Sequence, residues 1–147
     1  MKAQVRGEIG SRRAARENAV ELGYEQHMRG LTVAELLADR VLPPDDLTIQ
    51  IQNDAEKHRA RADRLIADVS EHWDLHRMPV MDLTVLRLGV AELIEAKTPP
   101  GVVIAETVYL TGLFSTEESS RFVNGILGAI SRSLSAQAEA SRSGVAD

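Results

Sequence analysis

Three arginines near the N-terminus have the residue type and the spacing to bind a phosphate chain. Arg12, Arg13 and Arg16 open a helical stretch, where the helix dipole favours anions over cations. Guanidinium groups beside a helix N-terminus make a good receptor for phosphate, because they donate paired hydrogen bonds in a fixed geometry. The alternative is a solvated charged turn, and the arginines alone do not decide between the two.

Other residue groups are of the types used in metal binding or catalysis, but the further residues that such sites need are missing. His72 and His76 stand four apart, as metal ligands on a helix do, yet no third ligand accompanies them. A helix start explains the carboxylates Glu117-Glu118, and a solvated face explains Glu92 and Glu95. No glycine-rich phosphate loop, serine elbow or cysteine–histidine pair occurs. We therefore expect no metal, no cofactor and no enzyme activity.

The composition narrows the class of protein. A chain of 147 residues fits one domain with a sizeable core. Aromatic residues make up only 3%, so the core is built from aliphatic side chains, which favours helix packing. The chain has no cysteine, which fits a reducing compartment. It has neither a secretory signal nor the apolar run of roughly 18 residues that a membrane span needs. We expect a cytoplasmic protein that does not enter a membrane.

The charge distribution points to a localised binding surface. A net charge of −5 argues against indiscriminate binding to nucleic acid. Residues 1–16 nevertheless carry five cations and one carboxylate, a local balance of +4. The cations are Lys2, Arg6, Arg12, Arg13 and Arg16, and the carboxylate is Glu8. We expect Arg12, Arg13 and Arg16 to gather on one accessible spot that binds a short anionic segment.

Apolar spacings of three and four predict helices almost throughout and no strand. The predicted helices run from Ser11 to Gly30, from Thr32 toward Val41, from Asp45 or Asp46 to Val69, from Met81 to Ala96, from about Val102 to Phe114, and from Ser115 to Leu134. Thr32 with Glu35, and Ser115 with Glu118, have the spacing of capping boxes. The helix over 81–96 is apolar nearly all round, so we expect it at the centre of the fold.

The prolines mark corners within one domain. Apolar stripes continue on both sides of Pro43-Pro44 and of Pro99-Pro100. We therefore expect residues 11–134 to form one all-α domain of six to seven helices, arranged as two small bundles that meet near Pro79. We expect residues 1–10 to form a flexible arm and residues 135–147 a frayed or disordered tail. Gly125 and Gly128 weaken the last helix, and close helix crossing is the expected compensation.

Several segments, in their order along the chain, resemble the NusB family of bacterial transcription antitermination factors. Arg12-Arg13-Ala14-Ala15-Arg16-Glu17 with Tyr24 looks like the opening of that family, and Asp82-Leu83-Thr84-Val85-Leu86-Arg87 looks like its central helix. Val103-Ile104-Ala105-Glu106-Thr107-Val108, followed by Phe122-Val123-Asn124-Gly125-Ile126-Leu127, resembles its C-terminal signature. The last motif is the most specific, and the likeness covers about residues 11–134.

The resemblance implies an all-α fold of two perpendicular bundles and a role in transcription antitermination. It implies pairing with NusE, a small-subunit ribosomal protein, and binding of single-stranded boxA RNA in ribosomal RNA transcripts, which helps RNA polymerase pass terminators. Together with the basic opening, it assigns RNA contacts to Arg6, Arg12, Arg13, Arg16, Glu118, Arg121 and Phe122. Partner contacts fall on Tyr24 and Asp82.

Four departures from the family pattern leave alternatives open. Ala14 and Gly112 stand where the family carries a cation, Ala105 replaces an asparagine, and Gln50–Asp54 replaces a more apolar stretch. A divergent adaptor that keeps the scaffold but has lost or altered boxA binding is one alternative. An accessory to an RNA methyltransferase is another, because similar helical domains are fused to such enzymes. The sequence also leaves a homodimer and the role of the tail open.

Overall fold

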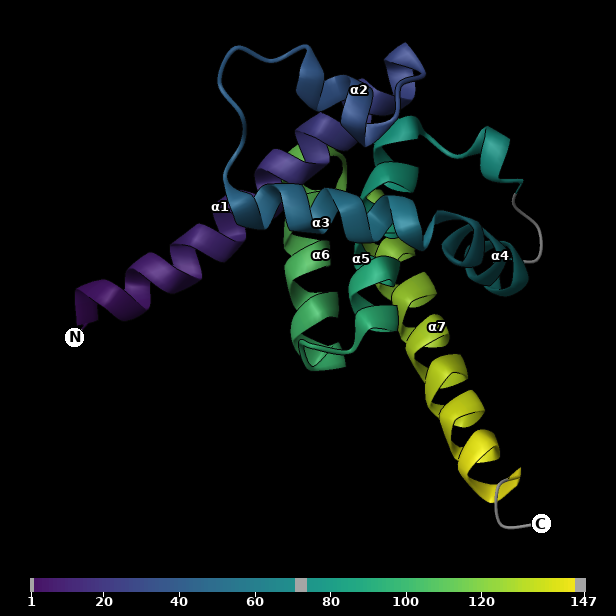
Figure 1. The fold of residues 1–147 in the computed structure, drawn as a ribbon. Helices are drawn as coiled ribbons and strands as arrows, with labels where there is room; N and C mark the ends of the chain where they lie inside the picture. The colour runs from purple at the N-terminus through teal and green to yellow at the C-terminus, as the bar shows by residue number, and fades with distance from the viewer. Residues whose placement is uncertain (1, 71–73, 145–147) are drawn as a thin grey trace.

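Helices form all the regular structure of the described residues in the computed structural model (Figure 1). It describes the backbone of residues 2–70 and 74–144 and the side chains of residues 12–70 and 74–144. The elements are α1 (Lys2–Arg29), α2 (Val33–Ala38), α3 (Asp46–Lys57), α4 (Arg59–Val69), the 3-10 helix η1 (Leu75–Arg77), α5 (Val80–Glu95), α6 (Pro100–Phe114) and α7 (Glu117–Gly144). Across these described ranges there are seven α-helices and no strand. The predicted all-α class is confirmed.

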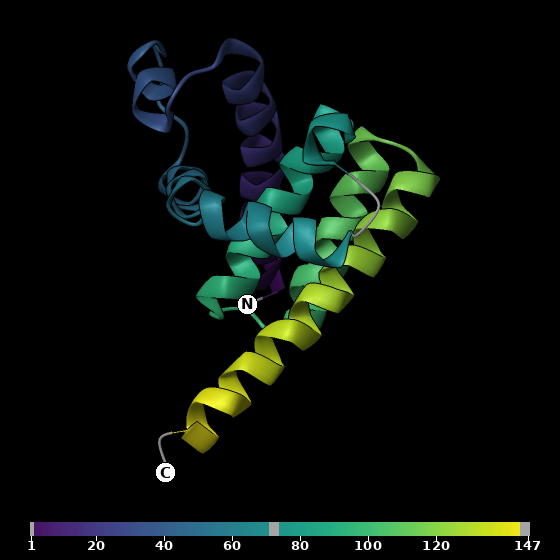
Figure 2. The same cartoon turned by 90° about the vertical axis from the view of Figure 1, so that its right-hand side faces the viewer.

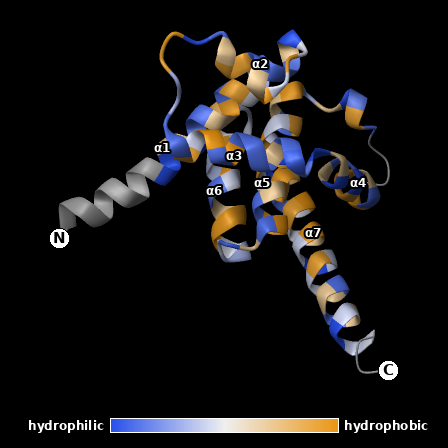
Figure 3. Ribbon diagram, viewed as in Figure 1, coloured by the Kyte–Doolittle hydropathy of each residue, from blue (hydrophilic) through white to orange (hydrophobic). Residues whose placement is uncertain are grey.

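Helix α5 lies at the centre, as its all-round apolar sequence predicts. It contacts α1, α3, α4, α6 and α7. Its buried apolar residues are Leu83, Val85, Leu86, Leu88, Val90, Ala91 and Leu93. Helices α1, α2 and α3 pack on one another, and α4, α6 and α7 form a second group around α5. In Figure 3 hydrophobic residues gather where helices meet, and much of the outer face of α3 is hydrophilic.

Local side-chain chemistry fixes the starts of α2 and α3. The Thr32 hydroxyl accepts a hydrogen bond from the Glu35 amide at 3.1 Å, and the Glu35 carboxylate accepts one from the Thr32 amide at 3.1 Å. This reciprocal pair confirms the predicted capping box. Asp45 caps α3, since its carboxylate accepts a hydrogen bond from the Thr48 amide at 2.7 Å.

The predicted capping box at Ser115 and Glu118 is wrong. Helix α7 starts one residue later, and the Thr116 hydroxyl accepts from the Ser119 amide at 3.0 Å. Ser115 instead donates its hydroxyl to Asp82. A tertiary acceptor has therefore drawn Ser115 away from the capping role that its spacing to Glu118 implied.

The two terminal helices are longer than the sequence pattern indicated. Helix α1 begins at Lys2 instead of Ser11, and α7 continues past Leu134 to Gly144. The extension of α1 projects from the body of the fold in Figure 1, and that of α7 does so in Figures 1 and 2. The alanine- and serine-rich extension of α7 contains no proline, so continuing a helix through it costs little per residue. The division into arm, domain and tail stays a prediction.

The predicted helix from Asp45 to Val69 is divided in two. His58 ends α3 and precedes α4, with φ −98° and ψ 7°. Its amide still donates to the Asp54 carbonyl at 3.0 Å, and its carbonyl accepts from the Ala62 amide at 2.8 Å. The two helices are therefore divided by the backbone angles of His58, whose ψ is far from the helical value. The apolar stripe continues across the break because both halves pack on α5.

The close helix crossing lies at Gly89 rather than at the predicted glycines. A Cβ on Gly89 would lie 2.9 Å from Thr107 Oγ1 and 3.3 Å from Leu127 Cδ1. At Gly125 a Cβ would meet nothing within 4 Å, and at Gly128 it would meet only the end of the Arg132 side chain at 3.4 Å. The predicted packing role of Gly125 is therefore wrong, and Gly89 lets α5 approach α6 and α7.

Candidate nucleic-acid interface

Arg16 is buried and held by a carboxylate of the central helix. Arg16 is 8% exposed. Its Nε and Nη2 atoms donate to the two carboxylate oxygens of Glu92 at 3.0 and 2.9 Å. Hydrogen bonding to Glu92 raises the pKa of Arg16, so the guanidinium stays charged. The prediction of an accessible cluster is wrong for Arg16, and so is the solvated role predicted for Glu92.

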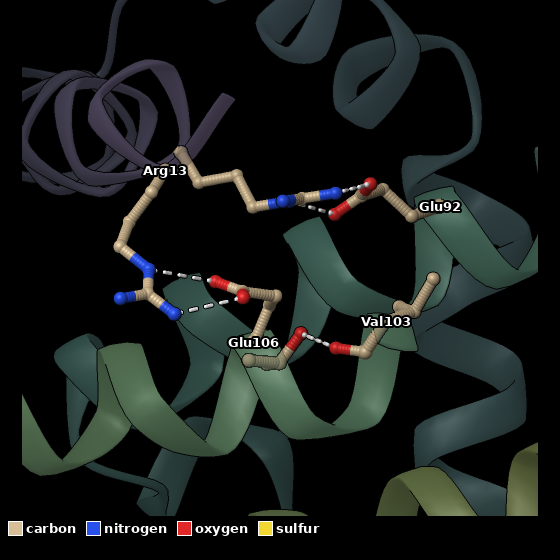
Figure 4. Close-up of polar contacts among 6 residues, drawn as sticks. Arg13, Glu92, Val103 and Glu106 are labelled. Atoms are coloured by element: carbon tan, nitrogen blue, oxygen red, sulfur yellow. Dashed lines mark hydrogen bonds and ion pairs between the residues drawn. The ribbon is translucent and has the colours of Figure 1, made fainter. Parts of the chain in front are cut away.

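Arg13 is also paired, but its side chain remains 43% exposed. Its Nε and Nη2 atoms donate to the Glu106 carboxylate at 3.2 and 3.0 Å (Figure 4). This hydrogen bonding raises the pKa of Arg13. The guanidinium carbon lies 4.3 Å from the ring centroid of Tyr109, which is a cation–π contact.

Of Arg12, Arg13 and Arg16, Arg12 is the one classed as exposed to solvent. Among the described side chains it forms no ion pair within 4.0 Å. It lines a hollow of about 160 Å³ between α1, α3 and α5, together with Gln50 and Asp54. The side chain of Arg6, also predicted to contact RNA, lies outside the described residues.

The other predicted RNA-contacting residues begin α7. Glu118 and Arg121 are exposed, and Phe122 is half-buried against the hydrophobic core. Figure 2 shows α5 and α6 between α1 and the first turns of α7. The structure therefore directs Arg12 to the hollow beside α3 and α5, and Arg13 to α6. It places the start of α7 apart from α1.

The two predicted partner-contacting residues differ in accessibility. Tyr24 on α1 is 38% exposed. Asp82, in the first turn of α5, is 4% exposed. The Asp82 carboxylate accepts hydrogen bonds from the Ser115 hydroxyl at 2.9 Å and the Ser119 hydroxyl at 2.8 Å. Asp82 thus connects α5 to the turn between α6 and α7. A residue that docks a partner protein must lie on the surface, and Asp82 does not, so the predicted partner contact is wrong for Asp82.

Sequence reasoning missed the two α6 residues that engage Arg13. Glu106 and Tyr109 are three apart, so they lie on one helix face, and that spacing was the available signal.

The described residues contain no group of three or more histidine, cysteine or acidic side chains that could hold a metal, and His72 lies outside them. No helix in the described part of the chain is long and apolar enough to cross a membrane.

Comparisons with known proteins give a consistent result. The NusB family profile matches residues 13–132. The transcription antitermination protein NusB of Thermobifida fusca is 45% identical over an aligned length of 123 residues, and the match covers 80% of this chain and 87% of that protein. The protein of the same name from Saccharopolyspora erythraea is 41% identical over an aligned length of 129 residues, and the match covers 83% of this chain and 87% of that protein.

Solved structures agree. T. maritima NusB superposes with a TM-score of 0.73 at 29% identity, covering 82% of this chain and 90% of that one. A crystal structure of antitermination factors NusB and NusE in complex with double-stranded RNA superposes with a TM-score of 0.70 at 30% identity. That match covers 83% of this chain and 96% of the matched chain.

Proposed function

The chain belongs to the NusB family, and we propose that it is a non-enzymatic transcription antitermination factor that pairs with NusE and binds boxA RNA. The observation that carries the proposal is its likeness, over 83% of its length, to a chain in a crystal structure of antitermination factors NusB and NusE in complex with double-stranded RNA. The names of its relatives support the same process. In this function the protein acts on RNA polymerase indirectly, through the RNA and NusE.

Arg12, Arg13 and Arg16 have different roles in RNA binding. Arg12, exposed and without an ion pair to a described side chain, neutralises a phosphate of the RNA. Arg16, bound to Glu92, positions α1 against α5 instead of touching RNA. Arg13 keeps an exposed guanidinium face next to Tyr109.

Fewer positive charges are free to bind RNA phosphates than the sequence implied. Glu106 and Glu92 each face one arginine, so two of the three positive charges are compensated inside the protein. With fewer free cations, binding of single-stranded RNA by this chain alone is modest. NusE then contributes by adding surface to the complex, with Tyr24 as an accessible contact on this chain.

A second candidate function is a protein adaptor without boxA recognition. Ala14 on α1, and Ala105 and Gly112 on α6, are exposed and offer no side-chain hydrogen bond to RNA. Gln50 and Asp54, which lie in another departure from the family pattern, line the hollow beside Arg12. These positions favour a changed RNA preference on an unchanged scaffold.

One experiment separates the two functions. Immobilised NusE captures this chain, and the captured complex is then tested for retention of labelled boxA RNA and of a scrambled RNA. Retention of boxA RNA above the scrambled RNA supports the antitermination factor. Capture by NusE without preferential RNA retention supports the adaptor.

A further inference from the structure

We infer that Tyr109 and Arg13 form a platform on which one nucleobase of single-stranded RNA stacks. The inference rests on the proposed RNA-binding function and assigns it a contact residue on α6. The two side chains come from α6 and α1, which meet at this point. Tyr109 is 41% exposed and the Arg13 side chain 43% exposed, so both planar side chains are accessible to solvent.

The ion pair with Glu106 determines what Arg13 can offer. Glu106 occupies the Nε and Nη2 donors of Arg13 (Figure 4), and its negative charge opposes a phosphate at the same edge. One flat face of the guanidinium lies over the Tyr109 ring. The opposite face remains for a base, because guanidinium faces stack on aromatic rings. Arg13 therefore serves base stacking better than phosphate binding.

The geometry is set before RNA arrives. Two hydrogen bonds fix the guanidinium plane, and the 4.3 Å approach to the Tyr109 centroid fixes its place over the ring. A side chain that is already ordered loses little conformational entropy when a ligand binds. The platform is therefore suited to an unstacked base, whose own ordering is the remaining cost.

The surrounding face of α6 matches a nucleobase better than a phosphate chain. Val102 is 47% exposed and Leu113 is 53% exposed. Ala105 and Gly112 on the same helix are also exposed. This strip along α6 is apolar, while Arg12 supplies a cation on the adjoining helix. A single strand offers both an apolar base and a charged backbone, whereas a duplex keeps its bases stacked inside.

The test measures the affinity of boxA-containing single-stranded RNA for the chain in complex with NusE, over a range of salt. We expect Tyr109→Ala to weaken binding by about 5- to 150-fold, as loss of one base–aromatic stack does. The slope of log affinity against log salt should stay unchanged, because no phosphate contact is lost. Tyr109→Phe should keep the wild-type affinity, and Arg12→Ala should make the slope shallower by about 0.7.

A set of RNAs, each with one abasic nucleotide, locates the stacked base. At one position the abasic RNA should bind wild-type protein more weakly than intact RNA does, while Tyr109→Ala binds both equally. Val41→Ala, which truncates a side chain that is 99% exposed in a loop, serves as the matched surface control and should match wild type. Thermal unfolding of Tyr109→Ala checks that the fold is kept.

The outcomes distinguish this inference from the proposed function. If Arg12→Ala weakens binding but Tyr109→Ala binds like wild type, the stacking platform is overturned and the function stands. If the wild-type complex with NusE binds no RNA, both are overturned. If Tyr109→Ala weakens binding equally for every abasic RNA and also loses NusE or self-association, the α6 face docks protein instead and the platform is overturned.

Discussion

Arg16 of α1 and Glu92 of α5 form a two-hydrogen-bond ion pair at 2.9 and 3.0 Å, and Arg16 is 8% exposed. The pair joins the most basic segment of the chain to its central helix. A second arginine, Arg13, makes the same kind of contact with Glu106 of α6. Two of the five cations in the basic opening of the sequence therefore attach α1 to α5 and α6.

Replacing Arg16 should cost stability, whereas replacing Arg12 should not. Arg16→Ala leaves the Glu92 carboxylate without its partner. We expect a loss of about 3 kcal/mol in the free energy of unfolding, the low end for broken buried pairs, because Glu92 keeps some contact with water. Arg12→Ala should stay within about 0.5 kcal/mol of wild type. Urea unfolding of both variants measures this, and equal midpoints would contradict the assignment of Arg16 as a positioning residue.

Alanine should act in opposite directions at two glycines. Gly89→Ala drives a Cβ to within 2.9 Å of Thr107 Oγ1, and overpacking of this kind costs about 1–3 kcal/mol. Gly125→Ala has open space around the new Cβ, so it should stabilise α7 by up to about 1 kcal/mol through helix propensity. Thermal unfolding compares the two variants. A stabilising Gly89→Ala would show that α5 and α6 are not as closely packed as described.

Replacing Asp82 should lower the free energy of unfolding, because its buried carboxylate connects α5 to the turn between α6 and α7. Asp82→Ala removes the carboxylate that accepts from the hydroxyls of Ser115 and Ser119, and we expect a loss of about 1–3 kcal/mol in the free energy of unfolding. Asp68→Ala, on an exposed residue of α4, is the matched control and should lie near wild type. Chemical denaturation gives both values. Similar stabilities for the two variants would rule out the structural role of Asp82.

The pair of His58 and Glu95 should make stability depend on acidity. The hydrogen bond with His58, and then the nearby charges, lower the pKa of Glu95 below its usual value of 4.5. Because the unfolded chain binds this proton at higher pH than the folded protein does, the stabilisation is complete above pH 4.5 and is lost as pH falls below it.

Comparison of wild type with Glu95→Gln isolates that effect. Glu35 and Asp45 also have lowered pKa values, but they are present in both proteins and cancel. The difference in the free energy of unfolding should shrink as pH falls from about 7 to about 3. A difference that stays constant over this range would exclude Glu95 as its source.

Local patterns predicted much of the fold. The capping box of Thr32 and Glu35 involves residues three apart, and the all-round apolar sequence of α5 forces burial wherever its neighbours lie. Such features depend on few neighbours along the chain. For that reason the helix order, the central helix and the all-α class followed from the sequence.

The candidate site depends on contacts that no local pattern contains. Arg13 and Glu106 are 93 residues apart, and Arg16 and Glu92 are 76 apart. A carboxylate on another helix decides whether each arginine faces solvent, and spacing within α1 carries no information about it. The sequence therefore located the arginines but could not predict that two of them are paired.

The most direct test of the account is the affinity of this chain and NusE together for boxA RNA, measured by fluorescence anisotropy against a scrambled RNA of equal length. We expect NusE to tighten boxA binding by about tenfold or more, equivalent to ~1.4 kcal/mol of added interaction, and the scrambled RNA to bind more weakly. Equal affinity for the two RNAs, with NusE demonstrably bound, would contradict the proposal that this protein recognises boxA RNA.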